Sequence, residues 1–312
     1  MPDVASRDGE LAPGARPLGE RVSVVIATHN RAEALERTLA ELRAVPDPPP
    51  VLVVDDASTD GTPEMVARKF PDVELIVRDR QEGPVARNHG VDRVGTPYVA
   101  FNDDDSWWAP GALERAIDVL DRHPRVAVVA AHILVGDDGR PDPICEEMAH
   151  SPVPGDDSVP GVPILSFMAG AAVLRRSAFR QVGGFEPRLV GGGEEESLAC
   201  DLAAAGWELR YVADAVVHHH PGGGDKSFDR MLGIRNALWF AWRRRPLGSA
   251  LRWTAYMLRA APRNRLSLRA LAEALRGLPW VLRTRRVVPP HVESGLRALD
   301  AEKMSSETRS YG

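Results

Sequence analysis

Three adjacent carboxylates, Asp103 to Asp105, follow the apolar stretch YVAFN at residues 98–102. Neighbouring carboxylates repel one another, and water has limited access to them at the end of a buried strand. Mg²⁺ and Mn²⁺ are commonly held by one or two carboxylates together with the phosphates of a substrate. The cluster therefore predicts an anchor for a divalent cation and a diphosphate. A solvated acidic loop before the helix that begins near Pro110 is the plainer alternative.

Polar residues also follow two other apolar runs. THNR (28–31) follows VSVVIA, and Asp55 and Asp56 lie within VLVVDDAS (51–58). Parallel strands end at the same edge of a sheet, and ligands of open α/β sheets bind outside that edge. The three polar strand ends therefore predict one ligand site. Turn and helix-cap chemistry explains Asp60 by itself, but not the same pattern on three strands.

Glycine-rich phosphate-binding motifs do not follow the first of these strands. Neither G-x-G-x-x-G nor a Walker lysine motif stands there, which argues against a dinucleotide or P-loop site. Carboxylates occupy the strand ends instead, so a bridging cation is expected to bring the phosphates to them.

The elements that position these groups are predicted from hydrophobic periodicity. Continuous apolar runs at 22–28, 51–58, 73–79 and 98–105 are typical of strands buried on both faces. Helical patterns at 31–45, 63–70 and 83–94 alternate with them. This alternation predicts an α/β fold with a doubly wound, mostly parallel sheet and helices on both faces.

Composition limits the classes of function. The chain has 312 residues, 44% of them hydrophobic, and a formal net charge of -5, which argues against a nucleic-acid partner. Cys145 and Cys200 are far apart and are expected to be unpaired. The N-terminus lacks the apolar core of a signal peptide, and no apolar stretch reaches about 18 residues. A cytoplasmic protein is therefore predicted.

The chain divides into four parts by composition. Residues 1–20 predict a flexible arm, residues 21–225 the α/β domain, residues 226–287 a basic, tryptophan-rich helical appendage, and residues 288–312 a polar, loosely ordered tail. Basic amphipathic helices with tryptophan suit a membrane interface, and Arg243 to Arg245 form the densest basic run. Peripheral contact with the inner face of the cell membrane is one prediction. A helical cap on the sheet with a solvated basic face is the other.

Five motifs together resemble glycosyltransferase family 2 over about residues 21–220. They are VSVVIATHNR, VVDDASTDGT, EGPVARNHG, FNDDDSWWAP and the segment from GGFEP through GGGEEESLACDLAAAGW to VVHH. The resemblance implies the GT-A fold and transfer of a sugar, with inversion, from a UDP-, GDP- or dTDP-sugar. It also implies Mg²⁺ or Mn²⁺ and a glycan, lipid-linked or small-molecule acceptor. A nucleotidyltransferase and a catalytically inactive sugar-nucleotide-binding member remain the alternative functions.

The resemblance assigns donor and metal roles position by position. Asp105 matches the direct metal ligand of the family's DxD motif, with Asp103 as its first aspartate, while Ser106 stands where a fourth acid is often found. Of the three histidines 218–220, His219 is the metal candidate, since alternate residues of a strand face opposite sides. The implied donor nucleotide set is Ala27, Thr28, Asn30, Arg31, Asp55, Asp56, Arg87 and Asp104, with Asp56 at the nucleobase.

The resemblance places the general base in GGGEEES. Inverting transfer needs a base to deprotonate the acceptor hydroxyl. Glu195 stands where the family usually has an aspartate base, Glu194 is the reserve candidate, and Glu196 fits the dipole preference of a helix N-terminus. Phe167, Met168 and Gly170 are expected at the acceptor floor, whereas Phe185 is expected to pack in the core.

Overall fold

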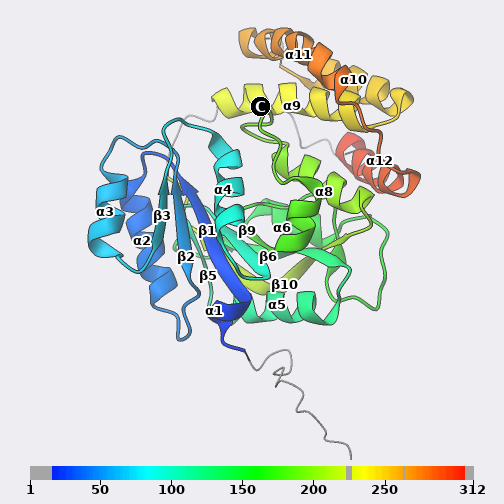
Figure 1. Cartoon of the computed structure of the whole chain (residues 1–312). Helices are drawn as coiled ribbons and strands as arrows, with labels where there is room; N and C mark the ends of the chain where they lie inside the picture. Colours follow the sequence, from blue (N-terminus) through cyan, green and yellow to red (C-terminus); the bar gives the residue numbers. More distant parts are fainter. Residues whose placement is uncertain (1–15, 223–226, 263, 306–312) are drawn as a thin grey trace, which may run out of the picture.

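The structure, a computed structural model, describes residues 16–222, 227–262 and 264–305 (Figure 1). The predicted arm at residues 1–15, Arg263 and the tail at 306–312 lie outside the described residues. One mixed sheet runs through the described part in the order β3-β2-β1-β4-β9-β6-β10-β5, with β7 and β8 at its side. The α/β fold expected from the sequence is confirmed.

The first half of the sheet is parallel. It contains β1 (Val22–Thr28), β2 (Val51–Asp55), β3 (Glu74–Val77) and β4 (Tyr98–Asn102). The intervening elements are α2 (Ala32–Arg43), α3 (Thr62–Lys69), the 3-10 turn η1 (Gly83–Val85) and α4 (Ala86–Arg93). Val24, Val25 and Ile26 are fully buried, which explains the unbroken apolar run, since helices cover both faces (Figure 1). Gly90 lets α4 approach β1 closely, because a Cβ there would lie 2.4 Å from Val25 Cγ1.

The second half of the sheet is mixed. It contains β5 (Ser106–Trp108), β6 (Val126–Val135), β9 (Ala171–Arg175) and β10 (Glu208–His219), with the short β7 (Arg140–Pro141) and β8 (Val162–Pro163). β9 runs antiparallel to both β4 and β6, β10 runs parallel to β6, and β5 runs antiparallel to β10. The helices here are α5 (Ala112–Arg122), α6 (Pro143–Ala149), α7 (Arg176–Val182) and α8 (Glu194–Ala204). The parallel pairing predicted from the sequence is thus found throughout β1 to β4 and again between β6 and β10, whereas the other pairs are antiparallel.

The two ends of the predicted catalytic domain differ from the sequence expectations. Leu18–Arg21 forms the short helix α1, and Leu18 is buried, so the predicted arm ends before residue 18. Residues 288–305 are not a loose tail. Pro290–Ser305 forms α12, whose Val292 and Leu296 join the main hydrophobic core. A helix with only a few buried apolar positions explains why the segment reads as polar in sequence.

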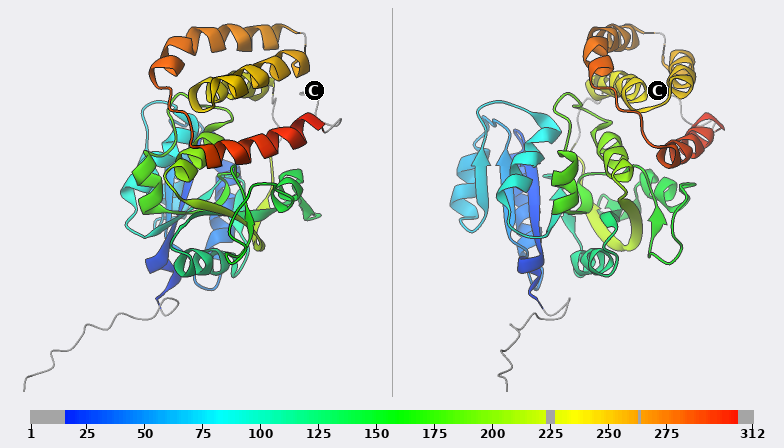
Figure 2. Two further views of the ribbon diagram at one scale, coloured as in Figure 1. Left: turned by 90° about the vertical axis from the view of Figure 1, so that its right-hand side faces the viewer. Right: turned by 45° about the vertical axis from the view of Figure 1, so that its right-hand side comes forward.

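The segment predicted as a helical appendage forms helices that share a hydrophobic cluster separate from the main core. It consists of α9 (Ser227–Arg244), α10 (Leu247–Ala260) and α11 (Arg265–Arg283). Trp239, Trp253 and Trp280 lie in this core, and Trp239 Nε1 donates to the Ala274 carbonyl at 3.0 Å. The tryptophans expected at a membrane surface are instead buried between helices. Figure 2 shows these helices stacked beyond one end of the sheet, with α12 between them and the catalytic domain.

The basic run Arg243 to Arg245 is also largely hidden from solvent, with Arg244 and Arg245 buried and Arg243 half-buried. Arg243 pairs with Glu186 at 2.8 Å and Arg244 with Asp201 of α8. Arg245 contacts Glu293 at 3.1 Å and Asp300 at 2.6 Å, both on α12. The prediction that this run contacts a membrane is wrong, because its guanidinium groups fix the appendage to the catalytic domain. No helix of the described residues is long and apolar enough to cross a bilayer.

Candidate active site

Hydrogen bonds join the loops that follow the carboxyl ends of β1 and β2. The backbone N–H of Asn30 donates to Ser58 Oγ at 2.9 Å, and the backbone N–H of Thr59 donates to Asn30 Oδ1 at 2.7 Å. Asn30 and Ala57 both have positive φ, +53° and +63°, a conformation that costs a non-glycine residue about 1–2 kcal/mol. Local strain of this kind gathers at functional sites. Asp60 accepts N–H bonds from Ala32 and Thr62, both at 3.1 Å, so its expected role in a turn and cap is confirmed.

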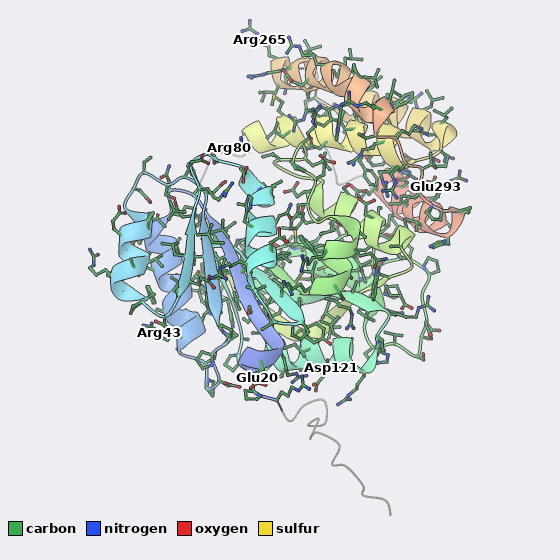
Figure 3. All side chains as sticks on the ribbon, viewed as in Figure 1. Glu20, Arg43, Arg80, Asp121, Arg265 and Glu293 are labelled. Atoms are coloured by element: carbon green, nitrogen blue, oxygen red, sulfur yellow. The ribbon has the colours of Figure 1, made fainter. Side chains whose placement is uncertain are left out.

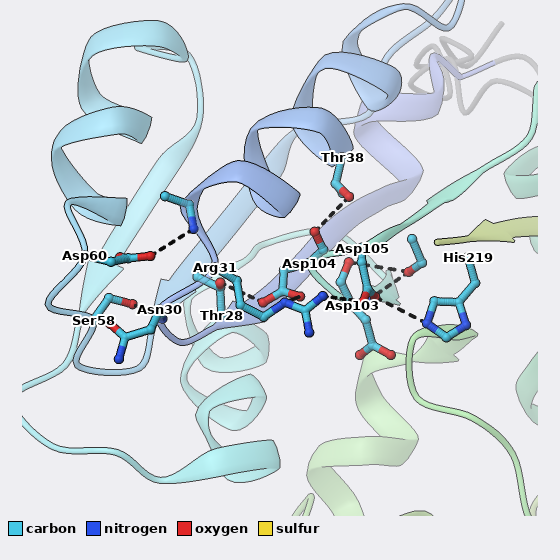
Figure 4. A network of polar contacts seen from close by, with 12 residues as sticks. Thr28, Asn30, Arg31, Thr38, Ser58, Asp60, Asp103, Asp104, Asp105 and His219 are labelled. Carbon is cyan, nitrogen blue, oxygen red and sulfur yellow. Dashed lines mark hydrogen bonds and ion pairs between the residues drawn. The ribbon is translucent and has the colours of Figure 1, made fainter. Parts of the chain in front are cut away.

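Asp104 lies behind the acidic cluster, against β1. Its Oδ2 accepts from Thr28 Oγ1 at 2.8 Å, and its Oδ1 lies 2.9 Å from Arg31 Nε (Figure 4). Burial raises the pKa of the Asp104 carboxyl to about 6, against the lowering effect of Arg31. The side chain of Thr38 on α2 donates to the Asp104 carbonyl at 3.0 Å. Asp104 is thereby held in the wall of the site.

Asp105 and His219 face one another across the site (Figure 4). His219 Nε2 lies 3.4 Å from Asp105 Oδ1, and Arg31 Nη2 lies 2.5 Å from Asp105 Oδ2. Burial alone would raise the pKa of Asp105, but the His219 hydrogen bond and the Arg31 charge hold it below the ordinary value. The same hydrogen bond raises the pKa of His219. Arg31 therefore bridges Asp104 and Asp105, a role that the sequence does not reveal.

The three histidines alternate as predicted. His218 and His220 lie against the Trp107 ring, with centroids 6.0 Å and 4.8 Å away, while His219 turns to Asp105. The His220 backbone N–H donates to the Asp105 carbonyl at 2.8 Å, which fixes the end of β10 beside the acidic loop. Two histidines are therefore structural, and one reaches the acidic cluster.

Asp103 is paired with Arg87 of α4. Gly170 lies against it, since a Cβ at this position would come within 2.3 Å of Asp103 Oδ2. Arg87 is buried, and its Nε has no hydrogen-bond partner among the described residues. A buried guanidinium N–H without a partner calls for an acceptor, and a phosphate oxygen is a suitable one.

Glu194 and Glu195 begin α8 close to this pair. Glu194 is buried, and its Oε2 accepts the Gly192 N–H at 2.8 Å. Burial raises the pKa of both carboxyls, and the charge of Glu194 raises that of Glu195 further, whereas Arg87 lowers both. Glu195 is half-buried. A carboxyl with a raised pKa is suited to proton transfer near neutral pH.

The loop that carries these glutamates is held by α9. The buried Asn236 donates to the Val190 carbonyl at 3.1 Å and to the Gly192 carbonyl at 2.6 Å. Sequence reasoning missed this residue. A buried asparagine among basic and apolar positions of a helix is the signal that could have found it, because a buried amide needs partners.

Asp56 holds the loop after β3. Its carboxylate accepts the Glu82 N–H at 2.8 Å and the Gly83 N–H at 2.7 Å, while Asp55 accepts from the Ser58 N–H at 3.1 Å. An open cavity of about 560 Å³ adjoins this loop and reaches Leu232 of α9. Asp56 is 2% exposed, so any influence on a ligand in that cavity acts largely through the loop that it positions.

The three residues expected at the acceptor floor differ in their surroundings. Phe167 is buried, Met168 is 42% exposed, and Gly170 adjoins Asp103. Phe185 packs against Phe101 and Phe179 in the core, as expected. Cys145 and Cys200 are free and buried, also as expected.

The donor set at Asp105 fits a cation that shares its ligands with a substrate. Asp105 and His219 offer one carboxylate and one imidazole that already face each other. No group of three or more His, Cys, Asp or Glu in the described part of the chain could hold a metal by itself. Such a pair suits an ion that takes its remaining ligands from phosphates and water, as Mg²⁺ usually does.

Comparison with known proteins agrees with this geometry. The model of glycosyl transferase family 2 matches residues 23–183. The chain is 30% identical to N-acetylglucosaminyl-diphospho-decaprenol L-rhamnosyltransferase of Mycobacterium tuberculosis, over 74% of this chain and 88% of that protein. It is 33% identical to the pre-mycofactocin glycosyltransferase of the same organism, over 66% of this chain and 44% of that protein.

Solved structures share the fold. The mannosyltransferase from Pyrobaculum calidifontis, in complex with GDP-Man and Mn²⁺, superposes with a TM-score of 0.59 at 21% identity, covering 96% of this chain and 91% of that one. S. aureus TarS 1–349 in complex with UDP-GlcNAc gives a TM-score of 0.59 at 17% identity, covering 93% of both chains. The fold is thus GT-A, and the chain belongs to glycosyltransferase family 2 and is a glycosyltransferase.

Proposed function

We propose that the chain is a metal-dependent, inverting glycosyltransferase that takes its sugar from a nucleoside diphosphate donor. One observation carries the proposal. Asp105, His219, Arg31 and the Asp103–Arg87 pair gather at one edge of the sheet, and the charges of Asp103 and Arg87 act on the pKa of Glu194 and Glu195. A cation–diphosphate anchor beside a carboxyl of raised pKa is the arrangement that glycosyl transfer with a diphosphate leaving group requires.

Asp105 and His219 would hold Mg²⁺ or Mn²⁺, with Asp103 nearby. When bound, the cation would offset negative charge on the donor diphosphate. Arg31 contacts both Asp104 and Asp105, and Arg87 has an unpartnered buried Nε. The free N–H of Arg87 would donate to a phosphate oxygen of the donor, while Arg31 would add positive charge beside the diphosphate and keep Asp104 and Asp105 in place.

Glu195 would act as the general base. Its carboxylate would accept the proton of the acceptor hydroxyl as that oxygen bonds to the anomeric carbon. The bond from this carbon to the diphosphate oxygen breaks, the nucleoside diphosphate leaves with the bonding electrons, and the configuration inverts. Glu194 is the weaker candidate, because its carboxylate already accepts the Gly192 N–H.

The nucleotide would lie where β1 and β2 end. Ala27, Thr28 and Asn30 come from β1 and its loop, while Asp55 and Asp56 come from β2. The cavity of about 560 Å³ beside residues 82–83 is large enough for a base and ribose. UDP-, GDP- and dTDP-sugars are the donor classes proposed.

A lipid-linked glycan is the acceptor class favoured. One relative is named for L-rhamnosyl transfer to N-acetylglucosaminyl-diphospho-decaprenol. Such an acceptor would place the enzyme in the cytoplasm, at the inner face of the cell membrane. A soluble glycan or small-molecule acceptor would not need that location.

Release of nucleoside diphosphate tests this function against the alternatives. The enzyme with Mn²⁺ should release the diphosphate slowly from one nucleotide sugar without acceptor, and chelation should stop the release. An inactive binding member would bind the donor but release nothing. A nucleotidyltransferase would release pyrophosphate from a nucleoside triphosphate instead, and no glycine-rich basic loop follows β1 to support that chemistry. The absence of diphosphate release from all three donor classes would contradict the proposal.

A further inference from the structure

A repeated Leu-Arg pair marks the outer surface of α10 and α11. The pair stands at residues 251–252 and 258–259 of α10 and at 268–269, 275–276 and 282–283 of α11. Seven residues are close to two helical turns, so the pairs of one helix share a face. All five leucines are 53–70% exposed, and all five arginines are exposed. We call these ten residues the Leu-Arg face.

Folding of the appendage does not require these leucines. The apolar residues that join α10 and α11 to α9 lie on other faces of the two helices, and they are the buried Ala250, Trp253, Met257, Ala270, Ala274, Trp280 and Val281. Single exposed leucines are common, but leucines repeated every seven residues on the outer faces of two successive helices are not. These leucines therefore indicate a surface that is covered by something other than the described residues.

The charge on the two helices identifies the kind of occupant. Together they carry six arginines and a single glutamate, Glu273, which is paired with Arg276 at 2.6 Å. A second copy of the chain would bring its own arginine rows to the same face, and like charges would oppose that contact. An anionic partner with an apolar layer beneath its charges matches both the arginines and the leucines of the face.

We propose that the Leu-Arg face docks peripherally on an anionic lipid surface. The leucines enter the boundary between headgroups and acyl chains, and the guanidinium groups lie at the headgroup phosphates. This surface differs from the one predicted from the sequence. The tryptophans of the appendage and Arg243 to Arg245 are buried or half-buried, whereas the Leu-Arg face is exposed and can contact lipid.

The position of the face suits the proposed reaction. The helices α9 to α11 lie beyond the end of the sheet where β1 and β3 finish, which Arg80 marks in Figure 3. Docking would thus hold the active-site edge toward the bilayer. The benefit of docking for the reaction rests on the proposed lipid-linked acceptor. Docking itself does not depend on catalysis, so the docking proposal and the proposed function can fail separately.

Vesicle sedimentation with the full chain tests the proposal. The probes are vesicles of equal parts phosphatidylglycerol and phosphatidylcholine, and vesicles of phosphatidylcholine alone. One variant combines Arg269→Gln, Arg276→Gln and Arg283→Gln. The matched control combines Arg93→Gln, Arg122→Gln and Arg125→Gln, whose side chains are 64%, 76% and 80% exposed, comparable with 75% for Arg276.

The wild type and the control should bind anionic vesicles at low salt and be released at about 1 M salt, where the Debye length falls to about 3 Å. Each interfacial arginine contributes about fivefold in partitioning, so the arginine variant should bind about 10²-fold more weakly. A second variant with Leu268→Gln, Leu275→Gln and Leu282→Gln should also lose binding at unchanged charge. Diphosphate release from a soluble donor should stay unchanged in all of them.

Three results would overturn the proposal. The wild type could fail to bind anionic vesicles at low salt, or the control could lose as much binding as the arginine variant. Alternatively, light scattering could show a wild-type dimer that the leucine variant converts to a monomer, with no vesicle binding by either. That last result would make the face a contact between copies.

Discussion

Replacing Glu195 with Gln should reduce catalysis and raise stability at the same time. Removal of a general base lowers turnover by about 10² to 10⁴-fold. Donor affinity should change little, because the proposed role of Glu195 is toward the acceptor. The substitution also removes a carboxyl whose pKa is raised by burial and by Glu194, so the folded protein no longer has to ionise it.

The stability effect has a defined sign and limit. A carboxyl whose folded pKa is raised above its ordinary value of 4.5 makes the wild type lose stability as pH rises above that value, until the folded pKa is passed. One proton limits the slope to about 1.4 kcal/mol per pH unit, and partial exposure of the side chain reduces it. The stability gain of Glu195→Gln should therefore grow from pH 5 to pH 8.

Two assays on one set of proteins check this reasoning. Transfer is followed by nucleoside diphosphate release with acceptor, and stability by urea unfolding at pH 5, 6.5 and 8. Glu196→Gln, on the same first turn of α8, is the matched control and should keep transfer. Because the folded pKa of Glu195 is raised to about 8, wild-type transfer should also rise with pH until that value is passed. Equal loss of transfer in both variants, or a stability difference that shrinks with pH, would refute the assignment of Glu195 as base.

The remaining predictions concern the metal, the nucleotide and the appendage. Asp105→Asn should abolish transfer and metal-dependent nucleotide binding, because an amide cannot offset cation charge; normal turnover in chelator would contradict this. Asp56→Ala should weaken binding of every donor that shares the nucleotide, since it frees the loop at 82–83; altered sugar preference at constant nucleotide affinity, measured by calorimetry, would count against it. Arg245→Met should lower the free energy of unfolding by about 3 kcal/mol, because Asp300 loses its arginine partner and Glu293 keeps only Arg297 and the Ser249 hydroxyl. The exposed Arg252→Met should change it by under about 0.5 kcal/mol in urea titrations, and similar values for the two variants would show that the Arg245 network is not stabilising.

The sequence predicts the parallel half of the fold well. Strands buried on both faces leave continuous apolar runs, and β1 to β4 are found inside the predicted ranges. The predicted strand ranges extend past the ends of β2 and β4, because Asp56 and Asp103 follow these strands directly in sequence but belong to the loops. The antiparallel insertion of β9 could not be predicted, because its pairing with β4 and β6 joins residues far apart in the chain.

The site was predictable where chemistry follows local geometry. The alternation of a strand separates His219 from its neighbours, and the acidic loop follows β4 directly. Roles that depend on distant partners were not predictable. Arg31 bridges two aspartates from another strand end, and Asn236 reaches the glutamate loop from the appendage.

The same limit explains the error at Arg243 to Arg245. A run of three arginines reads as a solvated or lipid-binding surface, because its acidic partners are far away in the sequence. Glu186, Asp201 and Glu293 meet these arginines only in the folded chain. The exposed positive charge lies instead on arginines spaced seven residues apart, which no single short stretch reveals.

The central claim is that Asp105 and His219 bind a nucleoside diphosphate through a divalent cation. Thermal unfolding with UDP, GDP and dTDP, each with and without Mn²⁺, tests it most directly. At 100 times its dissociation constant the correct nucleotide should stabilise the protein by about 2.7 kcal/mol, only with Mn²⁺ present, and Asp105→Asn should show no such gain. Equal stabilisation in chelator, or none from any nucleotide, would contradict the claim.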